Sequence, residues 1–276
     1  MQPRAEAPRA RAITSLQNER VKLIRSLQMR KARRATGLFV AEGASVLVSA
    51  RDAGWKPSIL VFLAGSAAAG VQRDVFAWAQ EAGAECLEVS QAVLAKLAAK
   101  DNPQTVLAVF EQRWFPLPLR EDIASQCLWV GLETVRDPGN LGTIIRTVDA
   151  VGAGGVTLIG NCVDPYSREA VRASMGSIFN AALSRTTVEE WLAWLPRWPG
   201  EIVGTHLEAT EDFRARAYRA PAFLLMGSEG PGLSAQLRAA CTRLVKIPMA
   251  GQLDSLNLAV AAALMLYEMR RERLRL

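Results

Sequence analysis

Hydrophobic and polar positions alternate in blocks along most of the chain. Short apolar runs such as 127–132 and 223–226 have few polar interruptions, which is typical of strands buried on both faces. Between these runs lie longer segments with the periodicity of helices. Near-continuous apolar strands separated by helices predict an α/β fold with a parallel sheet covered on both faces.

The first part of the chain predicts a small α/β unit that follows a basic helix. Within 15–27, Leu16, Leu23, Ile24 and Leu27 fall on one side of a helix and the basic residues on the other. The elements predicted after it are a strand at 37–41, a helix at 43–53, a strand at 58–63, a helix at 71–82, a strand at 85–89, a helix at 91–99 and a strand at 105–111.

A segment with two prolines, 113–119, interrupts this alternation and predicts an interdomain linker, because proline disfavours helix interiors and central strands. The predicted division is a first domain at 1–113, a linker at 114–126 and a second domain at 127–276. The second domain predicts strands at 127–132, 156–160, 202–206, 223–226 and 244–248, with helices from about 141, near 168–175, near 188–195, at 235–240 and at 256–271.

Composition excludes several classes of protein. Half of the 276 residues are hydrophobic, which is enough for a sizeable core and excludes a disordered chain. The longest apolar runs, such as 256–267, are too short and too interrupted to span a bilayer, so we expect a soluble protein without membrane association. The Arg-rich start would also suit a transit peptide, but the cytosol is the expected compartment.

The formal charge of +6 is concentrated at the start of the chain. Residues 1–40 contain ten Lys or Arg against two acids, a local excess of eight, and the rest of the chain has a net charge of −2. Such a cluster is either a docking surface for a polyanion or the solvated face of a helix, and the residues alone favour neither. The basic residues are Arg4, Arg9, Arg11, Arg20, Lys22, Arg25, Arg30, Lys31, Arg33 and Arg34.

Cysteine and histidine usage limits the chemistry further. The four cysteines are scattered without a C-x-x-C pair, so we expect neither a metal site nor disulfides. His206 is the only histidine and falls at the end of a predicted buried strand. This position favours a strand-end residue over a catalytic base.

Three polar loops follow predicted strands, where parallel sheets bind their ligands. In the first, 133–146, Asn140 can cap a helix whose first turns carry Thr143 and Arg146. By itself this loop is more typical of an ordinary capped helix with a solvent-facing arginine.

The second loop, 226–234, has three glycines around Glu229. The spacing G-x-x-G-x-G is neither a dinucleotide fingerprint nor a P-loop, and a glutamate among the glycines would repel a pyrophosphate. The loop therefore suits a ligand that presents donors or positive charge to closely approaching backbone. Taken alone, it is more often a plain glycine-rich turn.

The third segment, 247–268, leads into a helix that is apolar on nearly every face and must be buried between layers or between subunits. Asp254 or Ser255 can cap this helix. Asn257, in the first turn of so apolar a helix, is expected to be buried with a specific partner, because an unpaired buried amide is costly.

Taken together and in this order, three segments closely resemble the motifs of the SpoU/TrmH group of SPOUT RNA methyltransferases. They are Asn-Leu-Gly-Thr-Ile-Ile-Arg-Thr at 140–147, Gly-Ser-Glu-Gly-Pro-Gly-Leu at 227–233 and Ile-Pro-Met-Ala-Gly-Gln-Leu-Asp-Ser-Leu-Asn-Leu-Ala-Val-Ala at 247–261. The segments 164–168 and 172–177 are also similar to the family's connecting segment, and the likeness covers roughly 127–270. The first domain resembles, more loosely, the L30e/L7Ae-type RNA-binding domain that precedes the catalytic domain in many members.

The resemblance implies methyl transfer from S-adenosylmethionine to a ribose 2′-hydroxyl of structured RNA. It also implies a C-terminal deep trefoil knot, which periodicity could not have predicted, and a homodimer that builds the site from two chains. The knotted loops at 204–206, 226–232 and 247–256 would hold the cofactor largely through backbone contacts. The expected cofactor contacts are Thr205, Gly227, Ile247, Met249 and Leu256.

Residue by residue, the family's catalytic positions fall on Asn140, Arg146, Glu229, Ser255 and Asn257. The family proposal makes Arg146 the group that activates the hydroxyl. Because an arginine stays protonated at any ordinary pH, we expect Arg146 instead to hold the adjacent phosphate and to lower the hydroxyl pKa electrostatically. Glu229 would orient Arg146 or the loops, and Ser255 and Asn257 would shape the pocket.

The appended first domain and the basic helix favour large-subunit (23S) rRNA as the substrate, by analogy with the family. The alternatives are a tRNA 2′-O-methyltransferase, a non-catalytic RNA-binding protein of the ribosome, and an α/β enzyme acting on a small nucleotide. The sequence predicts neither the nucleotide nor the base that is modified.

Overall fold

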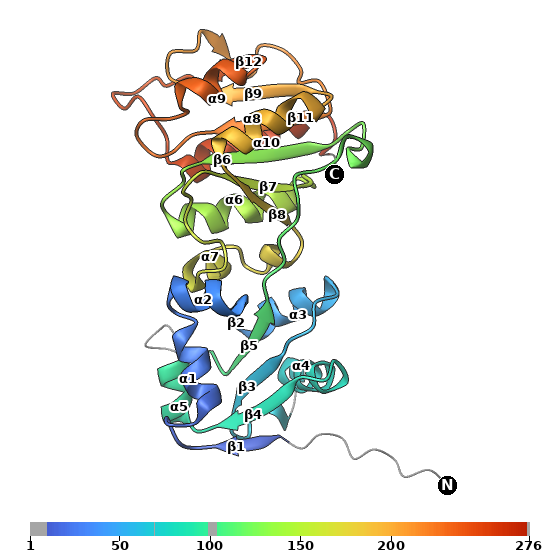
Figure 1. Ribbon diagram of the computed structural model, residues 1–276, viewed down its shortest axis with the longest axis vertical. Coiled ribbons are helices and arrows are strands. Elements are labelled where there is room, and N and C mark those ends of the chain that lie inside the picture. The colour runs from blue at the N-terminus through green and yellow to red at the C-terminus, as the bar shows by residue number, and fades with distance from the viewer. Residues whose placement is uncertain (1–9, 69, 99–103, 275–276) are drawn as a thin grey trace. The chain divides into compact units, whose positions relative to one another are not determined.

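The structure, a computed structural model, describes residues 10–68, 70–98 and 104–274 (Figure 1). The chain divides into two compact units. The first comprises Met1–Gln112 with Tyr166–Phe179, and the second comprises Arg113–Pro165 with Asn180–Leu276.

The first unit contains a five-stranded sheet in the order β1-β4-β3-β5-β2. The pairs β1–β4 and β3–β4 are parallel, whereas β5 pairs antiparallel with both β2 and β3, so this sheet is mixed. The strands are β1 (Arg11–Ile13), β2 (Leu38–Glu42), β3 (Ile59–Leu63), β4 (Glu85–Val89) and β5 (Val106–Glu111).

Helices of this unit pack in pairs, α1 with α5 and α3 with α4, and α7 packs against β2 although it comes from the later segment. They are α1 (Glu19–Ser26), α2 (Arg30–Thr36), α3 (Ala44–Asp52), α4 (Gly70–Glu81), α5 (Gln91–Leu97) and α7 (Arg168–Ala173). The last residue of the predicted helix 91–99 lies outside the described residues.

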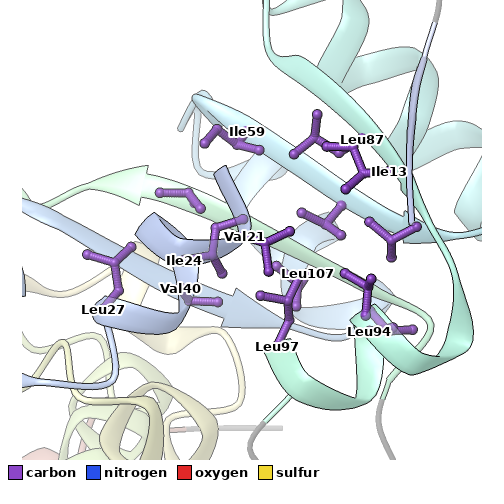
Figure 2. Packing of buried hydrophobic residues seen from close by; sticks show 14 residues of the cluster. Ile13, Val21, Ile24, Leu27, Val40, Ile59, Leu87, Leu94, Leu97 and Leu107 are labelled. Atoms are coloured by element: carbon purple, nitrogen blue, oxygen red, sulfur yellow. The ribbon is translucent and has the colours of Figure 1, made fainter. Parts of the chain in front are cut away.

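The predicted amphipathic helix is confirmed. Val21 and Ile24 of α1 and Leu27 just after it are fully buried in a cluster with residues of the sheet and α5 (Figure 2). Leu16 and Leu23 pack against the same cluster. The basic segment contains a second helix, α2, that periodicity did not predict; it ends at Gly37, whose φ of 68° is the left-handed conformation that glycine adopts without cost.

The second unit is built on a seven-stranded sheet in the order β10-β12-β9-β11-β6-β7-β8, and every neighbouring pair is parallel. The predicted parallel sheet is therefore confirmed here. The strands are β6 (Leu128–Glu133), β7 (Gly155–Ile159), β8 (Ala182–Thr186), β9 (Glu201–Thr205), β10 (Glu211–Asp212), β11 (Ala222–Met226) and β12 (Arg243–Lys246).

The helices of this unit include α10, which packs against α6. They are α6 (Pro138–Ala150), α8 (Val188–Trp194), α9 (Ala235–Ala240) and α10 (Leu258–Arg270). Asn140 does not cap α6 as predicted. Asp137 is the N-cap and accepts a hydrogen bond from the Asn140 backbone N–H at 2.6 Å, with Pro138 at the start of the helix.

Strand order determines where the loops meet. From β6 the chain builds outward through β7 to β8, and it then returns to place β9, β11 and β12 on the other side of β6. Such a reversal of strand order opens a crevice beyond the carboxyl ends of the central strands. The loops that leave β6, β9, β11 and β12 all lie at this edge.

Candidate active site

A cavity of about 750 Å³ lies beyond the carboxyl ends of β9, β11 and β12. Its walls come from three segments, 205–208, 226–232 and 245–258, together with Ala261. The volume is in the range of about 300–1,000 Å³ that is usual for small-molecule sites. The loops expected to hold the cofactor, 204–206, 226–232 and 247–256, therefore contribute to one cavity, whereas the predicted loop 133–146 does not line it.

All five residues expected to contact a cofactor line this cavity: Thr205, Gly227, Ile247, Met249 and Leu256. Three of the expected catalytic residues, Glu229, Ser255 and Asn257, line it as well.

The glycine loop between β11 and α9 folds tightly on itself. Ser228 and Gly232 form an antiparallel bridge, and a Cβ on Gly227 would lie 1.9 Å from the carbonyl carbon of Gly232. Gly230 has a φ of 115°, which side chains rarely tolerate. This part of the wall is therefore largely backbone, and no other residue fits at Gly227 without displacing the loop.

Two asparagines connect α10 to the glycine loop. The Asn257 Nδ2 donates to Asn140 Oδ1 at 2.9 Å, and the Asn140 Nδ2 donates to Glu229 Oε1 at 2.7 Å. These contacts join positions separated by 117 and 89 residues. The specific partner predicted for Asn257 is thus Asn140.

The same network fixes both amide orientations. Asn257 Oδ1 accepts from the backbone N–H groups of Ala259 and Val260 and caps α10, so its Nδ2 must face Asn140. Asn140 then has its oxygen toward Asn257 and its nitrogen toward Glu229, whose carboxylate can only accept. Each hydrogen bond of this network therefore joins an amide nitrogen to an oxygen.

Two expectations for this segment were wrong. Asn257 caps α10, in place of Asp254 or Ser255, and its side chain is exposed rather than buried. The reason is that the helix begins two residues later than predicted, so Asn257 lies at its open end.

Arg146 lies apart from this cluster. It is exposed on α6 and does not line the cavity. Six residues along a helix correspond to a rotation of about 240°, so Arg146 and Asn140 point in different directions. Among the described residues, none forms an ion pair with Arg146.

His206 follows the last residue of β9 and lines the cavity. Its Nδ1 accepts from the Glu208 backbone N–H at 3.2 Å, and its Nε2 lies 3.3 Å from Arg238 Nη1, which also pairs with Glu208 at 3.0 Å. These contacts hold the first residues of the segment that connects β9 to β11. Both ring nitrogens of His206 are therefore in contact with neighbouring groups of this segment and of α9.

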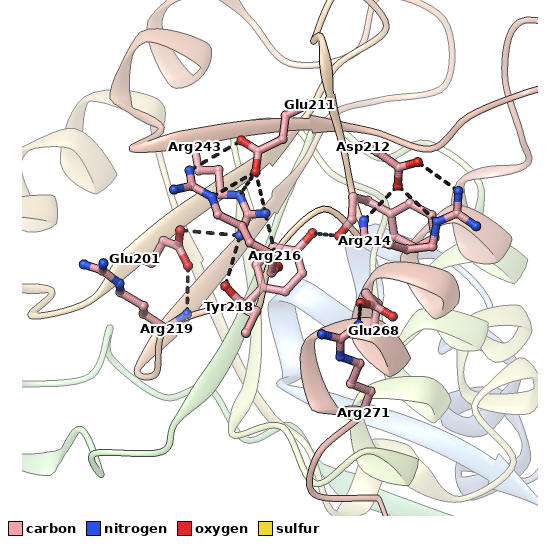
Figure 3. A network of polar contacts seen from close by, with 12 residues as sticks. Glu201, Glu211, Asp212, Arg214, Arg216, Tyr218, Arg219, Arg243, Glu268 and Arg271 are labelled. Atoms are coloured by element: carbon pink, nitrogen blue, oxygen red, sulfur yellow. Dashed lines mark hydrogen bonds and ion pairs between the residues drawn. The ribbon is translucent and has the colours of Figure 1, made fainter.

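The rest of that segment is held by Arg243, whose side chain is 1 % exposed (Figure 3). Its guanidinium pairs with Glu211 at 2.7 Å, donates to the carbonyl oxygens of Arg216 and Ala217, and lies 4.3 Å from the centre of the Tyr218 ring. Burial raises the pKa of Tyr218 to about 12. One buried arginine thus organises the segment whose first residues form a cavity wall, a role that sequence reasoning missed.

Metal-ligand clusters and membrane-spanning helices are both absent from the described residues. Within residues 10–68, 70–98 and 104–274, no three His, Cys, Asp or Glu side chains are placed to hold a metal ion. Among the same residues, no helix is both long enough and apolar enough to cross a bilayer.

Comparison with known proteins identifies the family. The SpoU rRNA Methylase family matches residues 128–267, and the MRM3-like substrate binding domain matches residues 18–108. This chain belongs to the SpoU rRNA methylase family. The α/β fold and the resemblance drawn from the three motifs are both confirmed.

Relatives within the SpoU family match almost the whole chain. A 23S rRNA uridine 2′-O-methyltransferase of Streptomyces viridochromogenes is 34% identical over 97% of this chain and 94% of its own. A 23S rRNA guanosine 2′-O-methyltransferase of Bacillus subtilis is 28% identical over 94% and 98%. The crystal structure of an AdoMet-bound rRNA methyltransferase from Sinorhizobium meliloti is 42% identical, covers 96% of this chain and 99% of its own, and has a TM-score of 0.87.

Proposed function

We propose that this SpoU-family protein transfers a methyl group from S-adenosylmethionine to a ribose 2′-hydroxyl of 23S rRNA. The observation that carries the proposal is the contact of Asn140, Glu229 and Asn257 at the edge of the cavity, because it joins all three family motifs. The proposed domains are an RNA-binding domain at 1–113, a linker at 114–126 and a catalytic domain at 127–276. We propose that the C-terminal loops of the catalytic domain form the family's trefoil knot. The proposed compartment is the cytoplasm.

The cavity suits this cofactor in charge as well as in size. Glu208, Glu229 and Asp254 line it against one lysine, Lys246, so its lining favours a ligand with net positive charge. Ile247, Met249 and Leu256 form an apolar part of the cavity wall, and the glycine loop lets backbone groups approach a ligand closely. When bound, S-adenosylmethionine supplies an electrophilic methyl group.

The chain's own residues then position the acceptor. Asn257 and Asn140 hold Glu229 at the cavity edge, and fixing reactants in this way contributes several kcal/mol, as an order of magnitude, toward lowering a barrier. Ser255 shapes the approach to the pocket. Glu229 is the carboxylate of this network and orients the loop or the incoming group.

Arg146 is proposed to hold the phosphate next to the target ribose and to stabilise negative charge on the hydroxyl oxygen. Its permanent charge suits this task better than proton removal. Since Arg146 is exposed and does not line the cavity of its own chain, we propose that it serves the site of a partner subunit.

The surface of α10 supports such a homodimer. Val260, Leu264 and Tyr267 recur at helical spacing on one face of α10 and are 50%, 40% and 52% exposed. Exposed apolar stripes of this kind mark interfaces between proteins. α10 packs against α6, the helix that carries Arg146, so the proposed interface and this arginine belong to neighbouring helices.

The basic face of the first unit supports RNA as the substrate. Of the ten basic residues, Arg4 and Arg9 lie outside the described residues, and Arg33 is buried and donates to the carbonyl oxygens of Leu27 and Gln28. The remaining seven are exposed: Arg11, Arg20, Lys22, Arg25, Arg30, Lys31 and Arg34. Cations grouped in this way are suited to an RNA backbone.

The experiment is transfer of labelled methyl from S-adenosylmethionine to unmodified 23S rRNA by the purified protein and by Arg146→Lys. We expect the wild-type protein to label the RNA and the lysine variant to be reduced by on the order of 100-fold, because lysine cannot form a bidentate phosphate contact. Normal turnover by Arg146→Lys would contradict the role of Arg146. No transfer by the wild-type protein to any RNA, with cofactor bound, would contradict the proposed function.

A further inference from the structure

Glu133 is a buried carboxylate without an assigned role. It is the last residue of β6 and is 7% exposed. Its Oε2 accepts a hydrogen bond from the backbone N–H of Ser234 at 2.7 Å, across 101 residues of sequence. None of the described residues forms an ion pair with Glu133, so this neutral N–H group is the partner that the structure gives to its charge. Burying a carboxylate without such a hydrogen-bond partner is costly.

Ser234 lies at the exit of the glycine loop. The loop leaves β11 after Met226, which pairs with Leu132 of β6, and it returns through the buried Leu233 to Ser234. Its entrance is therefore fixed to β6 by the sheet, and its exit is fixed to the next residue of β6 by the Glu133 side chain.

The loop at 133–146, which carries Asn140, begins at Glu133. Thr134, directly after Glu133, has a φ of 51°, an uncommon value for a residue with a side chain, and the chain then runs to Asp137 and Asn140. Glu133 is thus covalently continuous with the loop at 133–146, and it is hydrogen-bonded to the end of the glycine loop through the Ser234 N–H. The tips of these two loops meet in the 2.7 Å contact between Asn140 and Glu229.

We infer that Glu133 is a positioning residue that fixes the exit of the glycine loop, so that Glu229 meets Asn140 and the loop keeps its place in the cofactor wall. The inference rests on the proposed methyl transfer. Glu133 itself does not touch the cavity, since it is absent from its lining, so its effect passes through the loop.

A double-mutant cycle tests this coupling. We expect Glu133→Ala to lower kcat/KM by on the order of 10-fold to 100-fold and to raise the KM for S-adenosylmethionine, because small misplacements of a site are costly. Glu133→Gln should retain most activity, because an amide oxygen can accept the same N–H. Added to Glu229→Ala, Glu133→Ala should cause much less loss than it does alone, because both changes act on one contact.

A further variant removes the N–H donor of Ser234 instead, and a matched variant keeps it. Ser234 has a φ of −59°, which proline accepts, and Ser234→Pro deletes the N–H together with the hydroxyl that caps α9. Ser234→Ala deletes only the hydroxyl. We expect the proline variant to raise the cofactor KM and the alanine variant to leave it near the wild-type value.

The matched control is Ser184→Ala, which breaks a buried 2.8 Å hydrogen bond with Thr157 in the same sheet but away from the loops. It should lower the melting temperature without changing the KM. Additive effects of Glu133→Ala and Glu229→Ala, or equal damage by Gln and Ala at 133, would overturn the inference. An inactive wild-type protein would instead refute the proposed function, so the two failures are distinguishable.

Discussion

At the residue scale, the site depends on the direction of two amide groups. An asparagine that caps a helix with its oxygen has only its nitrogen left for a neighbour, and Asn257 uses that nitrogen to set Asn140. The orientation of Asn140 toward Glu229 therefore originates at the start of α10. The cap of α10 and the contact with Asn140 thus share one side chain.

Two substitutions at Asn257 separate these roles. Asn257→Asp keeps an oxygen for the cap but loses the donor to Asn140, so it should keep the melting temperature and lower kcat by roughly 10-fold or more. Asn257→Ala should lower both, with a loss of about 1 kcal/mol in unfolding free energy from the cap. Thermal unfolding and single-turnover rates measure the two effects. Full activity of the aspartate variant would refute the proposed role of the Asn257–Asn140 hydrogen bond.

The buried and half-buried thiols give a prediction on pH. Burial raises the pKa of Cys241 to about 12 and that of Cys86 to about 11, and it also raises the pKa values of Cys127 and Cys162. In the native protein at pH 8 the thiolate fractions of Cys86 and Cys241 should be far below the roughly one-tenth of a thiol with a pKa of 9. We expect slow alkylation of these two thiols until the chain is unfolded, measured by mass spectrometry.

The sign of the linkage follows from the same shift. An unfolded thiol releases its proton near pH 9, whereas the folded Cys86 and Cys241 hold theirs to about 11 and 12. Their contribution to stability is therefore complete below pH 9 and is lost as the pH rises toward those values. Stability that did not fall above pH 9 would contradict this account.

At the element scale, α10 has one buried face and one exposed apolar face. One face is buried against its own unit, and the other carries Val260, Leu264 and Tyr267 toward solvent. Leu264→Asp should disrupt a homodimer without disturbing the core, because it places a charge in an apolar interface. The control Val71→Asp changes a similarly exposed apolar residue of α4: Val71 is 47% exposed and Leu264 is 40% exposed.

The measurement is the molar mass of both variants by light scattering, together with their methylation rates. We expect a monomer with little activity for Leu264→Asp, and an unchanged dimer with near wild-type activity for Val71→Asp. A dimeric, active Leu264→Asp protein would show that this face is not the interface.

The elements also show what periodicity can predict. Strands such as β4 and helices such as α9 were predicted to the residue, because each has a clear apolar pattern and clear ends. The strands β1, β8 and β10 were missed, because they are short or interrupted by polar residues: β8 contains Ser184, Arg185 and Thr186. In sheets, tertiary pairing decides such segments more than local sequence does.

Candidate residues were predicted through the ordered motifs, and the cavity contains eight of the ten. The contacts among them were beyond the sequence, because Asn140, Glu229 and Asn257 meet only through the sheet order. The roles of Arg243 and Glu133 were likewise missed, since a charged residue at a strand end has no periodic signal that distinguishes a buried side chain from an exposed one.

At the scale of the whole molecule, charge and chemistry lie in different parts of the chain. The first 40 residues hold a charge excess of eight, and the rest of the chain is slightly acidic. We therefore expect RNA affinity to depend on the first unit and methyl transfer on the second.

Neutralising three exposed cations tests this separation. The triple change Lys22→Gln, Lys31→Gln and Arg34→Gln should weaken RNA binding and reduce the slope of log affinity against log salt by roughly 2 to 3, with kcat at saturating RNA little changed. The control triple, Lys56→Gln, Arg73→Gln and Lys96→Gln, removes the same charge from exposed positions outside the basic cluster. Equal losses in the two triples would show that the cluster is a solvated face without a docking role.

The central claim is the chemistry of the product. The most direct measurement is methylation of unmodified 23S rRNA, 16S rRNA and bulk tRNA in parallel, followed by alkaline hydrolysis, which spares a phosphodiester next to a 2′-O-methyl ribose. We predict label in 23S rRNA at one alkali-resistant linkage. Label in tRNA alone would contradict the assignment of 23S rRNA as the substrate. Label at an alkali-sensitive position would contradict ribose methylation itself.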